Sequence, residues 1–355
     1  MASAIGDLHR SDFEPAPGNG EERQAFVQMN PNRTQIREPP PPHELNGFLT
    51  SEDALFQTLH MGAAEVDEDK WMLVVDGIVE RPYAITLQQL RQLPSKTLTS
   101  FHECYGSPLL PPKKALSRIG NVRWTGVPLH SLIAAAKPHP QASFVWSEGL
   151  DRGKFGPVEA DRYQKDLPMD KALSAEVLVA YQMNSQPLGR NRGGPVRLVV
   201  PGWFGTNSTK WLSRLSVQDR RAPGPFTTTL YNERHPADDP ECESRPVWKV
   251  QPNSIIVAPT PETNIHGPEV LVEGWAWCCD SKGIGGVGVS VDEGQQWVMA
   301  EIGNREDFSW QRFRARLQLS PGSHVVLARA RSPSGRSQPM GEGRNHVHRV
   351  PIVVR

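Results

Sequence analysis

The stretch that decides the fold is VLVAYQMNSQPLGRNRGGPVRLVVPGWFGTNSTKWLSRLSV, residues 177–217. It contains two apolar runs, EVLVAYQM and VRLVVPG, which are typical of buried strands. The second run ends in Pro201-Gly202 and a loop rich in Gly, Asn, Ser and Thr, and Lys210 follows at once. Because a Gly-rich loop after a buried strand exposes backbone N–H groups, this segment predicts an anion-binding site.

Basic and hydroxyl side chains surround this loop. Arg190, Arg192 and Arg197 stand just upstream, and Ser208 and Lys210 lie within it. Arginine makes bidentate contacts with phosphate and lysine contributes a point charge, so the segment suits a phosphate group. The spacing matches neither a Walker loop nor a dinucleotide-binding fingerprint. A solvated basic loop would show the same spacing, so the residues alone leave both interpretations open.

From Trp71 to Val217, short β-rich runs alternate with helical ones. WMLVVDGIV predicts a strand, and residues 85–90 open a short helix with Thr86 as its N-cap. VPLHSLIAAA predicts a second helix, which Pro138 stops. This mixture is typical of an α+β domain.

From about Pro252 onward the pattern changes to alternation. VLVEGWAW places Trp275 and Trp277 on one face, which predicts core packing. VGVSVDEGQQWVMAEI predicts a hairpin that turns at residues 292–294, and FRARLQL and HVVLARARS alternate cleanly. Strands at regular spacing with Gly and Pro turns predict an all-β, immunoglobulin-like sandwich of about 100 residues.

The length of 355 residues predicts two or three domains. We expect an extended N-terminal segment over residues 1–49, the α+β domain over 50–250 and the sandwich over 251–355. The first segment is rich in Pro, Glu, Gln and Asn, and it cannot form a core by itself.

Charge and hydropathy exclude two classes of partner. The 39 Lys and Arg residues balance 39 Asp and Glu residues, whereas general nucleic-acid binding needs an excess of basic groups. No apolar run approaches the roughly 20 residues that span a bilayer, and the N-terminus has no apolar signal core. As written, the chain is expected to be cytoplasmic; a periplasmic or other compartment stays open if an export peptide precedes Met1.

The four cysteines form no CxxC pair, haem-attachment site or zinc spacing. Cys242, Cys278 and Cys279 are predicted to be free thiols, since a disulfide between adjacent cysteines would be strained. Cys104, in SFHECYGSP, ends an alternating stretch and precedes a Gly/Pro turn, where its sulfur can face a cavity. Thiolate suits a thiophilic metal, although a small buried thiol fits the same local sequence.

Together these motifs resemble the sulfite oxidase family of molybdopterin-dependent oxidoreductases. Residues 177–217 resemble its molybdopterin-binding segment, and WTGVPL, from Trp124, lies at the expected distance after the family's metal-binding cysteine. GWAW followed by VGVSVDEGQQW resembles its C-terminal dimerisation domain. The resemblance runs from about residue 55 to 340. It implies a sulfite-oxidase-type molybdopterin-binding domain, an all-β immunoglobulin-like dimerisation domain, a molybdenum–molybdopterin cofactor and a homodimer.

The resemblance also implies site residues. Cys104 matches the cysteine whose thiolate binds molybdenum, and Tyr231 matches the active-site tyrosine. Arg192 stands where the family commonly has a cofactor-binding histidine. The implied cofactor-binding residues are His60, Cys104, Asp151, Arg192, Arg197, Ser208 and Lys210.

Two departures from the family pattern concern the substrate. Many members have Arg-Asn-His where this chain has Thr58-Leu59-His60, and Cys-Ala-Gly-Asn-Arg-Arg where it has CYGSPL from Cys104. The lost arginines would surround a small oxyanion, and Thr58 and Pro108 do not replace their charge. The sequence therefore predicts two-electron oxygen-atom transfer on a small molecule other than simple sulfite.

Two alternatives remain. A true sulfite dehydrogenase would need relocated cations, for which the candidates are His102, Arg118, Arg123, Arg234 and His235. A non-catalytic molybdopterin-binding protein would have no need of Tyr231 beside Cys104, which argues against it. No haem-binding or flavin-binding segment is visible, so electrons are expected to pass to or from a separate partner.

Overall fold

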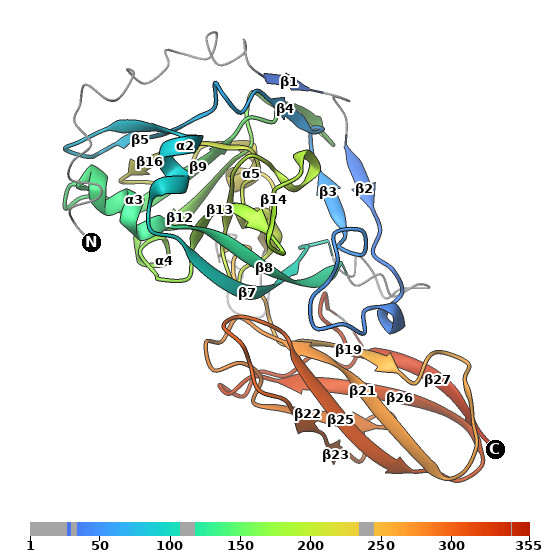
Figure 1. Cartoon of the computed structure of the whole chain (residues 1–355). Coiled ribbons are helices and arrows are strands. Elements are labelled where there is room, and N and C mark those ends of the chain that lie inside the picture. The colour runs from blue at the N-terminus through green and yellow to red at the C-terminus, as the bar shows by residue number, and fades with distance from the viewer. Residues whose placement is uncertain (1–26, 30–33, 107–117, 234–244, 342) are drawn as a thin grey trace.

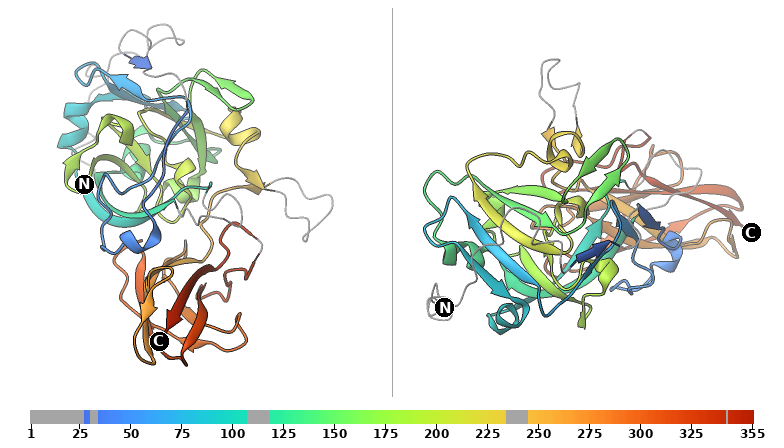
Figure 2. Two further views of the ribbon diagram at one scale, coloured as in Figure 1. Left: turned by 90° about the vertical axis from the view of Figure 1, so that its right-hand side faces the viewer. Right: turned by 90° about the horizontal axis from the view of Figure 1, so that it is seen from above.

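A computed structural model describes residues 27–29, 34–106, 118–233, 245–341 and 343–355. The chain forms a larger N-terminal domain of mixed structure and a smaller C-terminal domain of strands (Figures 1 and 2). No helix in these ranges is long and apolar enough to cross a membrane. Some of the predictions made from the sequence lie outside these described ranges, namely those for Ser107, Pro108, Leu109, Arg234, His235 and Cys242.

Two sheets form the N-terminal domain. The strand order of the first is β12 (Gln164–Pro168), β9 (Phe144–Gly149), β16 (Leu212–Gln218), β5 (Met72–Gly77) and β6 (Tyr83–Thr86). The order of the second is β14 (Gln186–Pro187), β13 (Leu178–Met183), β8 (Ile119–Pro128) and β7 (Lys96–Glu103), and β15 (Arg197–Val199) also pairs with β13. The two predicted strands of the 177–217 stretch are therefore direct neighbours, β13 and β15.

Short helices and two-stranded pairs complete this domain. Thr86 caps α2 with a full capping box, as its side chain accepts from the N–H of Gln89 while the Gln89 side chain accepts from the N–H of Thr86. The helical elements are α2 (Leu87–Gln92), α3 (Leu129–Ala136), α4 (Met169–Ala172), α5 (Pro225–Thr228), η3 (Pro42–Glu44), η4 (Arg190–Arg192) and η5 (Gly205–Asn207). The pairs are β1 (Val27–Met29) with β4 (Ala64–Val66), β2 (Gln35–Arg37) with β3 (Gln57–Leu59), β10 (Gly153–Phe155) with β11 (Val158–Ala160), and β17 (Asn232–Glu233) with β18 (Arg245–Pro246).

The main core of the N-terminal domain joins its two sheets and three of its helices, α2, α3 and α4. Leu73 and Leu215 of the first sheet and Val127 and Val179 of the second are fully buried in it, together with Leu132 of α3. Burying such side chains contributes roughly 1.5–3 kcal/mol each, so this core fixes the position of the strand ends and loops that carry polar residues.

The C-terminal domain is a sandwich of two sheets. One sheet has the order β19 (Asn253–Ala258), β21 (Glu269–Trp277), β25 (Gln311–Gln318) and β24 (Glu301–Ile302). The other has the order β20 (Asn264–Ile265), β27 (His348–Val354), β26 (Gly322–Arg331), β22 (Gly286–Ser290) and β23 (Val298–Met299). The predicted hairpin is present as β22 and β23, with Glu293 and Gly294 at positive φ in its turn. The predicted fold class, an α+β domain followed by an all-β sandwich, is confirmed.

The tryptophans of β21 are buried, but they do not fill the interior of the sandwich. Val272 and Ala276 point into the sandwich core, whereas Trp275 and Trp277 point to the opposite face. There Trp275 stacks on Trp310 with ring centroids 4.7 Å apart. Residues of both domains share this second core: Leu45, Phe101, Ile119, Phe204, Val247, Val250, Ile255, Val257, Trp275, Trp277 and Trp310. Core packing was predicted correctly, while its location between the domains was not.

The described part of the N-terminal segment runs along both domains. Its strand β2 pairs with β3, and the indole N–H of Trp275 donates to the carbonyl of Leu45 at 2.6 Å. The indole N–H of Trp310 donates to the carbonyl of Phe48 at 2.9 Å. The segment therefore joins β3 of the larger domain to the tryptophan core, and the boundaries at 49/50 and 250/251 stay predictions.

Candidate active site

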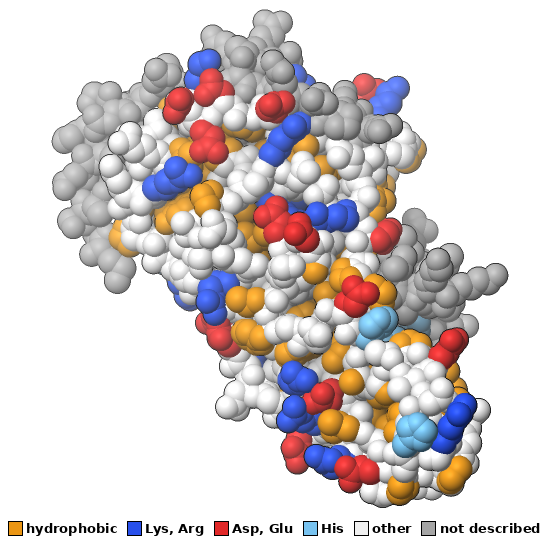
Figure 3. Space-filling view, turned by 45° about the vertical axis from the view of Figure 1, so that its right-hand side comes forward, with side chains coloured by type: hydrophobic (Ala, Val, Ile, Leu, Met, Phe, Trp, Pro, Cys, Tyr) orange, Lys and Arg blue, Asp and Glu red, His pale blue; other side chains and the backbone are white. Residues whose placement is uncertain are grey.

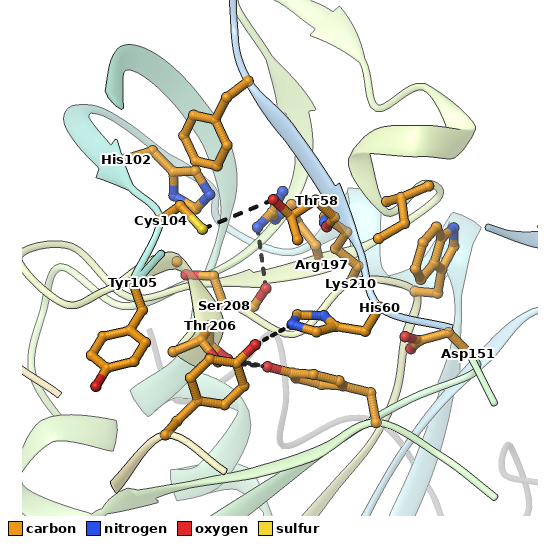
Figure 4. A pocket seen from close by; sticks show the side chains of 16 residues that line it. Thr58, His60, His102, Cys104, Tyr105, Asp151, Arg197, Thr206, Ser208 and Lys210 are labelled. Atoms are coloured by element: carbon orange, nitrogen blue, oxygen red, sulfur yellow. Dashed lines mark hydrogen bonds between the residues drawn. The ribbon is translucent and has the colours of Figure 1, made fainter. Parts of the chain in front are cut away.

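A hollow with about 560 Å³ of empty space, part of which is open to solvent, lies in the N-terminal domain, where β3, β7 and β15 meet the loops that follow them (Figure 4). The lining residues are Phe56, Thr58, Leu59, His60, His102, Cys104, Tyr105, Asp151, Tyr163, Arg197, Gly205, Thr206, Ser208, Lys210, Trp211 and Tyr231.

Cys104 stands at the end of β7, where the strand opens into the cavity. Its backbone N–H donates to the carbonyl of Arg118 at 2.9 Å, which extends the β7–β8 ladder by one residue. Its sulfur lies 3.9 Å from the hydroxyl of Thr58 on the facing strand β3. The main-chain contact fixes the thiol while one side of the sulfur remains directed at the cavity.

Two cations face the cavity, and among the described residues neither makes an ion pair, although the carboxyl group of Asp151 acts electrostatically on Lys210. The guanidinium of Arg197 donates to the carbonyls of Arg192 and Ser208, and the ammonium of Lys210 donates to the carbonyl of Thr58 at 2.6 Å. Burial, and then the charge of Arg192, lowers the pKa of Arg197 to about 9. Burial, and then the charge of Arg197, lowers the pKa of Lys210 to about 7. Burying two cations next to each other costs free energy, and the binding of an anion to them lowers that cost.

Asp151 is the buried acid of the cavity. Its side chain is 3% exposed, and its Oδ1 atom has no hydrogen-bond partner. Burial raises its pKa to about 7, against the opposing charge of Lys210. A buried acceptor without a donor destabilises the folded protein by about 1–3 kcal/mol. A ligand with an N–H or O–H donor next to Asp151 would remove this cost.

Tyr231 and His60 form a hydrogen-bonded pair on another side of the cavity, between the tyrosine hydroxyl and His60 Nε2. Burial, and then the charges of Lys210 and Lys165, lowers the pKa of His60 to about 3, so the imidazole is neutral. Burial raises the pKa of Tyr231 above its usual range, so its phenol stays protonated. Tyr231 also has a positive φ of 58°, a strained backbone angle that places its ring over the cavity.

The structure brings together most of the residues that the sequence predicted for the site. Those in the cavity wall are His60, Cys104, Asp151, Arg197, Ser208, Lys210 and Tyr231.

Arg192 is the exception, because it does not line the cavity, and its contact with the cofactor stays a prediction. Its guanidinium is buried and donates to the carbonyls of Glu52, Leu55 and Phe56. Arg192 therefore anchors the chain that leads into β3, and its donors are already engaged by main-chain carbonyls.

Of the candidate relocated cations, the three that the structure describes are neutral or lie beside a carboxylate. His102 lines it, but burial, and then the charge of Arg197, keeps its pKa well below the usual range, so it is neutral. Arg118 is paired with Glu38 at 2.8 Å, and Arg123 lies 3.8 Å from Glu306.

Sequence reasoning missed the aromatic part of the wall. Phe56, Tyr105, Tyr163 and Trp211 line the cavity, and the hydroxyl of Tyr163 donates to the carbonyl of Thr206 at 2.6 Å. These residues come from separate elements, and no local pattern in the sequence marks them.

Comparisons with known proteins agree with this architecture. Residues 60–226 match the oxidoreductase molybdopterin binding domain, and residues 244–352 match the Mo-co oxidoreductase dimerisation domain. The fold and the site thus define a molybdopterin oxidoreductase. Within that class, the chain belongs to the sulfite oxidase family.

Three similar proteins cover most of the chain. Mitochondrial sulfite oxidase of Rattus norvegicus is 28% identical over 332 residues, which cover 85% of this chain and 59% of the relative. Sulfite oxidase of Arabidopsis thaliana is 25% identical and covers 89% of each chain. The crystal structure of the sulfane dehydrogenase SoxCD from Paracoccus pantotrophus matches with a TM-score of 0.75 at 25% identity, over 97% of this chain and 95% of that one. The chain thus spans about three fifths of the length of the rat enzyme.

The family's molybdenum cofactor fits the residues present. Its phosphate is an anion, which the unneutralised cations Arg197 and Lys210 require. Its pterin carries N–H donors, which the unpaired Oδ1 of Asp151 requires. The thiol of Cys104 supplies the soft ligand that a thiophilic metal prefers.

Proposed function

We propose that the protein transfers an oxygen atom to or from an uncharged or organic small molecule, such as a sulfoxide or another organosulfur compound, rather than acting on sulfite. The observation that carries this proposal is the lack of free charge on the described cavity wall around Cys104. Phe56, Thr58 and Tyr105 are neutral, and burial keeps His102 uncharged. A desolvated dianion would need cations there.

Two described cations near Cys104 and Tyr105 lie beside carboxylates. Arg118 makes two hydrogen bonds to the carboxylate of Glu38, at 2.8 and 3.2 Å. Arg344, from the C-terminal domain, lies over the ring of Tyr105, 3.5 Å from its centroid, and its Nε lies 3.4 Å from Glu233. A pair of this kind presents little net charge to a substrate, which supports an uncharged one.

The chain's own residues have separable roles in this proposal. Arg197, Ser208 and Lys210 would hold the phosphate of the cofactor, Asp151 and His60 would contact its pterin, and Cys104 would hold the metal. The cofactor, when bound, supplies two-electron redox chemistry at molybdenum. Tyr231 stays protonated, and it can donate its one proton to a substrate oxygen when neutral His60 carries its proton on Nε2 and donates to the tyrosine oxygen. The aromatic wall excludes water from the reacting groups.

Sulfite oxidation is the second candidate, because the rat and Arabidopsis relatives carry that name. Steady-state kinetics of the metal-loaded protein with sulfite and with a panel of sulfoxides decides between the two. Each missing charged contact contributes roughly 1.5–3 kcal/mol, so two of them weaken sulfite binding by about two to four powers of ten.

The matched variant for this test is Thr58→Arg, which restores one cation and is expected to raise kcat/KM for sulfite while lowering it for a sulfoxide. A wild-type kcat/KM of about 10⁵ M⁻¹s⁻¹ or more with sulfite would replace our proposal with the sulfite dehydrogenase.

We also propose that the protein is a homodimer and exchanges electrons with a separate partner. The match of residues 244–352 to a dimerisation domain supports the first point. Light scattering at micromolar concentration tests it, and a monomer there would contradict it.

A further inference from the structure

An ion pair with a buried arginine and a half-exposed glutamate lies behind Cys104. The main chain of Cys104 pairs with that of Arg118, and the Arg118 guanidinium makes a two-pronged contact with the carboxylate of Glu38. The Arg118 side chain is 9% exposed and that of Glu38 is 43% exposed. Burial opposes the charge of Arg118, but the hydrogen bond to Glu38 and the adjacent sulfur of Cys104 raise its pKa above the usual range.

We propose that Glu38 sets how much positive charge Arg118 presents to the sulfur of Cys104, and thereby tunes the reduction potential of the metal that Cys104 holds. This inference rests on the proposed function, since it requires molybdenum on Cys104. Glu38 and Arg118 are positioning residues in this scheme: neither touches the substrate or the reacting atoms.

The physical basis is the charge next to a ligand atom. A cation or an N–H donor beside a thiolate withdraws electron density from the sulfur, which stabilises the reduced metal and raises its potential. A carboxylate on the far side of the same guanidinium opposes that effect, less strongly than a buried one would, because water reaches Glu38. Arg118 therefore raises the potential and Glu38 moderates the rise.

The fold holds the main chain at Glu38 in place beside Arg118. It follows β2, whose residue Arg37 donates to the carbonyls of Glu52 and Leu55 and pairs in register with Gln57 of β3. β3 in turn carries Thr58, the residue beside the Cys104 sulfur. Glu38 lies outside the matched range 60–226, whereas Cys104 and Arg118 lie within it, so the N-terminal segment adds a charge next to the family domain.

The test is a redox titration of the metal-loaded protein followed by electron paramagnetic resonance. Glu38→Gln keeps the shape of the side chain but removes its charge. The reduction potential of the molybdenum couple should therefore rise by about 30–59 mV for one electron, which is about a 3- to 10-fold change in the equilibrium constant for reduction. Arg118→Met should shift it downward. The matched control is Glu65→Gln, which removes a carboxylate that is 56% exposed and 3.8 Å from Arg190, and it should leave the couple nearly unchanged.

Each result has a definite meaning. An unchanged potential in Glu38→Gln, or an equal shift in Glu65→Gln, would overturn the inference while leaving the proposed function intact. A wild-type protein with no molybdenum signal would overturn the proposed function and this inference with it. If Arg118→Met does not fold, Glu38→Gln carries the test alone, because it is isosteric and lies at a half-exposed position.

Discussion

The charges of the cavity and those of the sandwich surface are arranged in opposite ways. On the sandwich, Glu273 of β21 pairs with Arg312, at 3.1 Å, and with Arg314, both from the neighbouring strand β25. Figure 3 shows basic and acidic side chains next to one another on this part of the molecule. In the cavity, Arg197 repels Lys210, no ion pair is formed by either of these described cations, and the nearby acid, Asp151, has its pKa raised to about 7.

The difference shows which region is complete without a ligand. The arginines of the sandwich have their counter-charges on the next strand, so that domain stabilises itself. The cations of the cavity raise the free energy of the cofactor-free protein, and that cost is recovered when an anion binds. A cluster of buried, unneutralised cations is therefore a better sign of a ligand site here than the number of basic residues.

The largest expected effect is that of Cys104→Ser. A serine oxygen is harder and not ionised at neutral pH, so it is a poor ligand for a soft metal site. We expect redox activity to fall by about three powers of ten or more, a barrier increase of roughly 4 kcal/mol, while the chain stays folded and retains pterin through Arg197, Ser208 and Lys210. Metal analysis, pterin fluorescence and a dye-reduction assay check this. Full activity in the serine variant would refute the role of Cys104.

The next variant separates cofactor binding from the stability of the cofactor-free protein. Lys210→Met removes a cation from the cavity, so it should reduce the molybdenum bound per chain by about tenfold, equivalent to 1.4 kcal/mol. The same change should stabilise the cofactor-free protein by about 0.5–2 kcal/mol, because it removes the burial cost of the ammonium and its repulsion by Arg197, and these outweigh the lost attraction to Asp151. The control is Lys154→Met, at a lysine that is 77% exposed, which should change neither quantity. A destabilised cofactor-free Lys210→Met protein would contradict the comparison.

Much of the fold and site follows from local sequence. Thr86 is an N-cap because of the residues that come just after it, and Arg197, Ser208 and Lys210 lie within one short segment. Cys104 is recognisable because it ends a strand. Local chemistry fixes each of these features, so no knowledge of distant contacts is needed to predict them.

Other features depend on partners that lie far away in the chain. The alternation of β21 predicts that Trp275 and Trp277 share a face, but not that the other domain covers it. Arg192 has the charge of a phosphate ligand, yet main-chain carbonyls about 140 residues upstream take its donors. The contact of Glu38 with Arg118 has no signal in either local sequence.

The cavity should also respond to pH. Relative to their usual values, the pKa of Lys210 is lowered to about 7 and that of Asp151 is raised to about 7. As the pH rises through 7, Lys210 loses positive charge and Asp151 gains negative charge, so the cavity becomes a weaker anion site. We expect sulfate, whose charge is constant in this range, to raise the melting temperature of the cofactor-free protein more at pH 6 than at pH 8.

Two controls belong to the sulfate measurement. Chloride at equal ionic strength separates binding from screening, and Lys210→Met should show little sulfate effect at either pH. An equal sulfate effect at pH 6 and pH 8 in the wild type would show that neither group titrates as the geometry predicts.

The smallest effect is expected on the sandwich surface. Glu273→Gln removes the carboxylate that Arg312 and Arg314 share, and the side chain of Glu273 is only 13% exposed. Burial raises the pKa of that carboxyl, but the hydrogen bonds from Arg314 and Arg312 outweigh it and hold the pKa below its usual range. Both arginines remain hydrated, at 40% and 57% exposure, so they can turn to water when the glutamate is lost.

We therefore expect Glu273→Gln to lower the free energy of unfolding by about 0.2–1 kcal/mol, with no change in molybdenum content. Chemical denaturation at low and high salt checks this, because screening should reduce the difference. Glu269→Gln, at a carboxylate that is 53% exposed, is the matched control and should cost less. A loss of several kcal/mol in Glu273→Gln would mean that the sandwich, like the cavity, depends on a buried charge, and the contrast between the two regions would fail.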